Sequence, residues 1–203
     1  MTPSQAINGA LRKVPAWTIY IGIAAWVVWL FYLGLTGGLG VEPINALERE
    51  YGALGLKLLI LGLLVTPLRK WTGVNLIKFR RAIGVTSFFM ILAHFLVWAV
   101  LDVQTFARVW MEIVKRPYVT VGMVAFVLLI PLAATSNNLS VRRLGAARWR
   151  KLHKLTYPAA ILGGVHYLWL VKGFQIEPII YLIVILGLVA TRYTSIGWRR
   201  QAV

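Results

Sequence analysis

The stretch AIGVTSFFMILAHFLVWAVL, from Ala82 to Leu101, decides the fold class, because its twenty residues are almost entirely apolar. An α-helix needs about 20 apolar residues to cross the hydrocarbon core of a bilayer. The one ionisable side chain in the stretch is that of His94. The stretch therefore predicts a membrane-spanning helix that carries a histidine inside the apolar layer.

Five further apolar blocks flank this stretch, and 59% of all residues are hydrophobic, which is more than soluble domains contain. The six predicted helices cover about 15–36, 53–68, 82–101, 118–135, 155–172 and 176–194. The first block is too long for the apolar core of a signal peptide, so we expect a retained helix. We therefore expect an all-α integral membrane protein, a six-helix bundle in which residues 1–203 form one domain.

Basic residues gather in alternate connections between these blocks and give the chain its net charge of +16. The basic residues that follow the second, fourth and sixth blocks are Arg69, Lys70, Lys78, Arg80, Arg81, Arg142, Arg143, Arg148, Arg150, Lys151, Lys154, Arg199 and Arg200. Cytoplasmic loops of membrane proteins carry such an excess of lysine and arginine. We therefore expect both termini in the cytoplasm and no nucleic-acid partner, because the charge serves topology.

The chain contains no cysteine. This excludes disulfides, cysteine-ligated iron–sulfur clusters and covalent haem attachment through C-x-x-C-H. The sequence also has no G-x-G-x-x-G or Walker motif, so it encodes no nucleotide domain. Any cofactor must be held non-covalently.

Two histidines, His94 and His166, lie inside apolar blocks at the same predicted depth. His94 follows Arg81 by 13 residues and His166 follows Lys154 by 12, so each is roughly 18–20 Å above the inner end of its helix. A single buried histidine could serve only an interhelical hydrogen bond. Two imidazoles at one depth can instead ligate one haem iron from both faces. The pair Gly163–Gly164 could leave room for the flat macrocycle, or serve helix packing.

The inner ends of the same two helices carry His153, Arg80 and Arg81. Arginine keeps its proton and has no lone pair to offer iron, so a second bis-histidine haem is not encoded. His153 is either a ligand of a second haem or a surface histidine in a basic loop. Arg80 and Arg81 either set the topology or bind an anion such as a haem propionate or a flavin phosphate. Pro158, which follows His153, could kink the fifth helix.

Two connections show apolar residues at helical spacing, 103–116 and 139–154. Each is typical of an amphipathic helix that lies in the membrane interface, although a solvated basic loop is an equal alternative for the second. The first connection is acidic, with Glu42, Glu48 and Glu50. We expect these glutamates and the segment 103–116 to offer docking features on the outer side.

Seven motifs extend along nearly the whole chain. They are GGLGVEP (37–43), LKLLILGLLVTPL (56–68), RRAIG (80–84), AHFL (93–96), RPYVTVG (116–122), LAATS (132–136) and RWRKLHKLTYPAAILGGVHYLW (148–169). With these motifs the chain resembles the MsrQ family, the haem-binding membrane subunits of the bacterial periplasmic methionine sulfoxide reductase system. That family belongs to the ferric reductase/NADPH oxidase transmembrane superfamily.

The resemblance implies an electron-transfer subunit of the bacterial inner membrane that holds b-type haem. Electrons would come from the quinone pool and leave to a periplasmic molybdenum-containing partner that reduces methionine sulfoxide in proteins; FMN is also associated with the family. The haem-iron ligands carry over onto His94 and His166, with His153 as the third family histidine. The chain departs from the oxidases at Arg80, which puts an inner haem in doubt. It also lacks their flavin and nucleotide domain, so an external donor is required.

Two alternatives to the relay stay open at this point. One is a self-sufficient enzyme, such as a quinol-dependent metal reductase. The other is a non-redox transporter or scaffold whose histidines lie on a proton path.

Overall fold

The computed structural model describes residues 2–171 and 173–200, and regular structure in this part of the chain is helical. The α-helices are α1 (Pro3–Lys13), α2 (Trp17–Leu35), α3 (Pro43–Thr72), α4 (Arg80–Leu96), α5 (Phe106–Lys115), α6 (Pro117–Ala134), α7 (Asn138–Leu144), α8 (Ala146–Leu152), α9 (Thr156–Leu170) and α10 (Ile176–Arg200). Short 3-10 helices occur at Ile77–Phe79 and His153–Leu155, and a π-helix at Val97–Val103. Residue 172, where the fifth helix was expected to end, lies outside the described residues.

Four of these helices are long and apolar enough to cross a membrane: α2, α3, α4 together with its flanking short helices, and α6. The expectation of an all-helical, multi-pass membrane protein is therefore confirmed. Within the described residues α9 and α10 are not in this set, and α9 has only 15 residues. Their crossing of the membrane stays a prediction.

Helix α3 begins at Pro43, about ten residues before the predicted start at 53. The prediction started at the first long apolar run and so left out the first turns of α3, which carry charged residues such as Glu48 and Glu50. Pro43 at the first helical position is a signal for the true start. The connection between α2 and α3 therefore covers only residues 36–42. Glu48 is half-buried, so the expectation of an exposed acidic loop that contains it was wrong.

Helix α1 was not predicted from the sequence, although its start carries a capping box. The Thr2 hydroxyl accepts from the Gln5 backbone, and the Gln5 side chain accepts from the Thr2 backbone. The Asn8 amide donates to the Gly73 carbonyl, and the Lys78 ammonium donates to two carbonyls at the C-terminal end of α1. These bonds hold α1 against the connection between α3 and α4.

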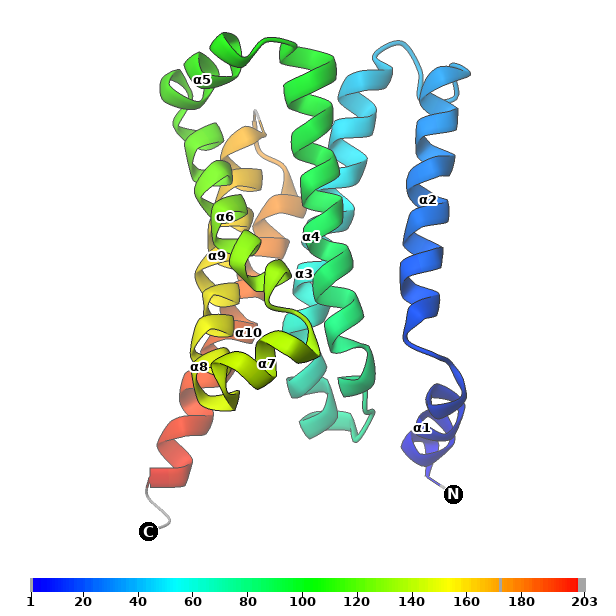
Figure 1. The fold of residues 1–203 in the computed structure, drawn as a ribbon, viewed down its shortest axis with the longest axis vertical. Coiled ribbons are helices and arrows are strands. Elements are labelled where there is room, and N and C mark those ends of the chain that lie inside the picture. The colour runs from blue at the N-terminus through cyan, green and yellow to red at the C-terminus, as the bar shows by residue number, and fades with distance from the viewer. Residues whose placement is uncertain (1, 172, 201–203) are drawn as a thin grey trace.

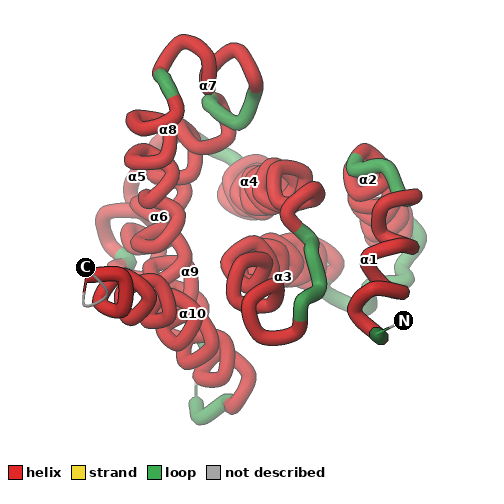
Figure 2. Tube along the Cα trace, turned by 90° about the horizontal axis from the view of Figure 1, so that it is seen from below, coloured by secondary structure: helices red, strands yellow, loops and turns green. Residues whose placement is uncertain are grey.

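The long helices pack as two close pairs, α3 with α4 and α6 with α9, while contacts between the pairs are sparser. Figures 1 and 2 show α10 beside α9, and α2 at the opposite edge of the bundle. Helix α5 lies across one end of the bundle, whereas α1, α7 and α8 lie near the other (Figure 1). Met90, one turn before His94 on α4, is 1% exposed and packs in a core cluster with Leu30 and Tyr51.

The two connections with helical spacing both fold as helices. In α5 the side chains of Phe106, Trp110 and Val114 lie exposed on one face, while Val109 is buried. This confirms an amphipathic helix in the first segment. The second segment folds as two short helices, α7 and α8, which Gly145 separates with a positive φ of 75°.

Candidate cofactor site between α4 and α9

The outer histidine pair, His94 on α4 and His166 on α9, meets between the two helix pairs. The ring centroids lie 6.3 Å apart and the ring planes are inclined by 70°. His94 lies in the last turn of α4 and His166 in the second half of α9. Both helices run toward the α5 end of the bundle (Figure 1). Two histidines that follow Arg81 and Lys154 by nearly equal numbers of residues therefore lie side by side in the structure, as their spacing predicted.

Backbone carbonyls orient both rings. The Nδ1 atom of His94 lies 2.9 Å from the Glu48 carbonyl, and that of His166 lies 2.7 Å from the Tyr118 carbonyl. A carbonyl only accepts hydrogen bonds, so Nδ1 carries the proton in each ring. The Nε2 atom of each neutral imidazole therefore keeps its lone pair for a metal.

The ring separation fits one metal ion held by both imidazoles. Metal–imidazole bonds are about 2 Å long, and a ring nitrogen lies about 1 Å from the ring centroid, so two such ligands place their centroids about 6 Å apart. The observed separation of 6.3 Å matches this value. Within the described residues no group of three or more His, Cys, Asp or Glu side chains forms a metal site.

Aromatic side chains fill the contact between α4 and α6. Phe126 stacks on Phe88 at 5.8 Å and on Phe95 at 5.3 Å, and Phe95 lies 6.1 Å from Trp98. The stacked rings tie α6 to α4, the helix that carries His94.

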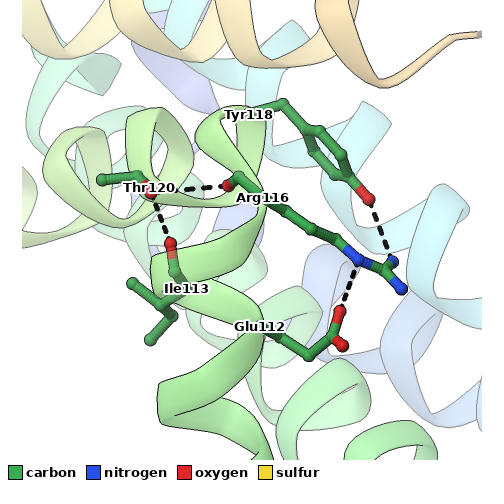
Figure 3. Close-up of polar contacts among 5 residues, drawn as sticks. All are labelled: Glu112, Ile113, Arg116, Tyr118 and Thr120. Carbon is green, nitrogen blue, oxygen red and sulfur yellow. Dashed lines mark hydrogen bonds and ion pairs between the residues drawn. The ribbon is translucent and has the colours of Figure 1, made fainter.

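The corner between α5 and α6 fixes the turn that supplies the Tyr118 carbonyl. Arg116 donates to the Tyr118 hydroxyl and pairs with the Glu112 carboxylate, and the Thr120 hydroxyl donates to the Ile113 carbonyl (Figure 3). The hydrogen bond with Tyr118 is the main reason why the pKa of Arg116 is raised. The network ties the first turn of α6 to α5 and so holds the acceptor of His166 in place.

Comparison with known proteins identifies the family. Residues 51–164 match the family model of the ferric reductase like transmembrane component. The chain is 44% identical over 177 residues to the protein-methionine-sulfoxide reductase haem-binding subunit MsrQ of Brucella ovis, and equally to that of Brucella canis. These alignments cover 87% of this chain and 80% of each relative. The chain belongs to the MsrQ family. No solved structure matches it.

In this MsrQ-family chain, Gly163 and Gly164, which precede His166 on α9, serve helix packing. A methyl group at Gly164 would lie 3.0 Å from Ile185 and 3.1 Å from Leu182, both on α10. One at Gly163 would make an ordinary 3.6 Å contact with Leu56 on α3. Of the two roles that the sequence left open for these glycines, the contacts favour helix packing.

The third family histidine, His153, is held in a different way from the outer pair. Its Nε2 lies 3.1 Å from the Thr135 hydroxyl, and its ring stacks on Trp149 at 3.8 Å. The Thr135 hydroxyl uses its one proton in a 2.6 Å bond to the Pro131 carbonyl, so it accepts from His153. The Nε2 atom of His153 therefore carries the proton, and its lone pair is at Nδ1.

His153 also lies outside the helix that carries His166. It belongs to the 3-10 turn before α9, and Pro158 sits in the first turn of α9, where a missing N–H costs nothing. The two histidines are thus separated by a helix start instead of a kink inside one helix. Burial first, and then the charge of Arg80, lowers the pKa of His153 from its ordinary value of 6.5.

The inner arginines Arg80 and Arg81 begin α4 and are exposed. The charge of Arg80 acts on His153, so these two predicted residues lie near each other. Sequence reasoning missed a third arginine at this level, Arg192 on α10, whose guanidinium donates to the Leu63 carbonyl at 2.6 Å. The charge of Arg80 acts on Arg192 as well. The register of α10 against α3 decides this position, and the sequence pattern does not contain that register.

Proposed function

We propose that the chain holds one haem b between His94 and His166 and acts as an electron-transfer subunit. The observation that carries the proposal is the pair of neutral imidazoles 6.3 Å apart, each with Nδ1 bonded to a carbonyl and Nε2 left for a metal. Haem iron already has four macrocycle nitrogens and takes histidine as an axial ligand. The relatives' name, haem-binding subunit, supports the same cofactor.

Haem, when bound, supplies reversible one-electron chemistry, and the protein contributes ligation, burial and orientation. His94 and His166 would hold the iron from two sides. The aromatic column of Phe88, Phe126 and Phe95 would help to hold α4, and with it His94, in place against α6. No residue of the site needs to act on a substrate, which suits a relay.

We further propose that α9 and α10 also cross the bilayer, which gives a single domain of six spanning helices in the bacterial inner membrane. The concentration of basic residues at the end that carries α1, α7 and α8 supports cytoplasmic termini. The α5 end, with the outer histidine pair, then faces the periplasm.

Electrons would enter at the cytoplasmic level, near Arg80, Arg81 and His153, from the quinone pool. Exposed guanidinium groups at the start of α4 are suited to bind an anionic group, such as a haem propionate or the phosphate of FMN. Ligation of a second haem through Nε2 of His153 would require the loss of its hydrogen bond with Thr135 and a change of tautomer. The structure therefore favours one haem over two.

Electrons would leave to a periplasmic, molybdenum-containing methionine sulfoxide reductase that repairs oxidised proteins. The name of the relatives supports a methionine sulfoxide reductase as the partner, and its periplasmic location and molybdenum belong to the proposal. Glu42 and Glu50 are exposed near the α5 end, and Phe106 and Trp110 expose an apolar face on α5. These features are available for docking or for contact with lipid.

If the chain is a relay, the redox state of its haem should depend on both the electron donor, quinol, and the electron acceptor, the reductase partner. In purified protein, quinol should reduce the haem, seen as a shift of the Soret band, and the oxidised partner should restore the starting spectrum. Free methionine sulfoxide without the partner should have no effect. Reoxidation by free sulfoxide would overturn the relay, and steady turnover with quinol and a ferric chelate would support a self-sufficient metal reductase instead.

A further inference from the structure

The two carbonyls that orient the outer histidine pair share one local arrangement. Each lies four residues before a glycine on the same helix: Glu48 before Gly52 on α3, and Tyr118 before Gly122 on α6. In an α-helix a side chain leans toward the N-terminus and covers the turn before it. The residue at position i+4 therefore shields the carbonyl at position i, unless that residue is glycine.

Both glycines are in close contact with an imidazole. A methyl group at Gly122 would lie 2.7 Å from Nδ1 of His166 and 2.9 Å from its Cε1. A methyl group at Gly52 would lie 3.0 Å from Nδ1 of His94 and 3.3 Å from its Cε1. Real Cβ atoms do not approach other atoms within 3.0 Å, so the ring of His166 would have to move, and that of His94 would have to give slightly.

We propose that Gly52 and Gly122 are positioning residues that let each imidazole reach a helix carbonyl and so present Nε2 to the haem iron. The inference rests on the proposed haem site. An Nδ1–H bond to a carbonyl fixes the tautomer and ring orientation of a metal-bound histidine and strengthens it as a donor. The stronger donor favours ferric over ferrous iron, because electron donation stabilises the higher charge.

Two other glycines, one on α3 and one on the histidine-bearing helix α4, provide controls. A methyl group at Gly55, one turn after Gly52 on α3, would lie 2.7 Å from Ile91 on α4 and would disturb helix packing without touching a histidine. A methyl group at Gly84 on α4 would meet nothing within 4 Å. Gly55→Ala shows what damage to the α3–α4 contact does when no histidine ring is displaced. Gly84→Ala shows the effect of replacing a helix glycine by alanine where the new methyl group meets nothing.

The experiment compares the haem-loaded wild type with Gly52→Ala, Gly122→Ala, Gly55→Ala and Gly84→Ala in detergent. Electron paramagnetic resonance of the ferric state, the haem midpoint potential and the haem affinity are measured for each. We expect Gly122→Ala to lose most of its low-spin signal, to show a raised potential and to bind haem about tenfold more weakly. Gly52→Ala, with the milder overlap, should keep its haem but show changed g-values and a raised potential.

Both controls should keep the wild-type signal and potential, even if Gly55→Ala lowers the yield of folded protein. Wild-type g-values and potential in Gly52→Ala would overturn the inference, and they remain measurable if Gly122→Ala fails to fold. A shift in Gly55→Ala equal to that in Gly52→Ala would also overturn it, because packing alone would explain both. Failure of the haem site itself would appear separately, as a bis-histidine spectrum that survives in His166→Ala.

Discussion

If the hydrogen bond between Thr135 and His153 stabilises the fold, His153 has a structural role and not that of a haem ligand. A double-mutant cycle measures the coupling energy of this bond. Thr135→Val preserves shape but removes the hydroxyl that accepts from Nε2 of His153 at 3.1 Å. A half-buried N–H group is then left without its partner. His153→Phe removes that N–H group and keeps a ring to stack on Trp149, which lies at 3.8 Å.

The expected magnitude follows from the two hydrogen bonds of the Thr135 hydroxyl. An average hydrogen bond contributes about 1 kcal/mol net, and an orphaned donor costs about 1–3 kcal/mol. Because His153 is only half-buried, Thr135→Val should cost about 2 kcal/mol, which combines the lost bond to Pro131 with the orphaned N–H. In the His153→Phe background the same change should cost about 1 kcal/mol, so the coupling energy is about 1 kcal/mol.

Unfolding in mixed detergent micelles, followed by tryptophan fluorescence, gives the four free energies. Ser136→Ala is the matched control, because its hydroxyl bonds only the Leu132 carbonyl at 2.7 Å and does not touch His153. This control should be additive with His153→Phe. A coupling energy below about 0.3 kcal/mol for the Thr135 pair would refute the reasoning and leave His153 free for a second haem.

Three further predictions concern the outer surface, the inner arginine and acid stability. Reversal of Glu42 and Glu50 to lysine should slow haem reoxidation by the partner in stopped-flow experiments, more at low than at high ionic strength, and an unchanged rate would exclude this surface from docking. Arg80→Leu should insert normally but be reduced more slowly by quinol; a wild-type rate would leave Arg80 a purely topogenic role. The pKa of His153 is lowered in the folded chain, so below pH 6.5 the unfolded chain binds more protons than the folded one. The free energy of unfolding should therefore fall as the pH drops below 6.5. If a His153→Gln variant shows the same slope of stability against pH as the wild type, this prediction is wrong.

Much of the architecture followed from apolar block length and charge. The run from Ala82 to Leu101 predicted a spanning helix, and α4 with its π-helical extension covers it. The start of α3 at Pro43 was missed because the first turns of this helix are charged. Helix α1 was missed although Thr2 and Gln5 form a capping box at its start. These two differences have local signals that a search for helix starts would detect.

The candidate site was predictable only in part. The spacing of His94 and His166 along their helices was enough to predict that the two rings lie at one level. It could not show which glycines matter, because Gly52 and Gly122 act on rings that belong to other helices, and the register of α3 against α4 and of α6 against α9 decides that contact. The role of Thr135 was hidden for the same reason, since it meets His153 through tertiary packing.

The central claim is that His94 and His166 together ligate one haem iron. Electron paramagnetic resonance of the ferric wild type, His94→Ala and His166→Ala, each loaded with haem, tests it most directly. We predict a low-spin bis-imidazole signal in the wild type and its loss in both variants. A low-spin bis-imidazole signal that persists in either variant would contradict the account.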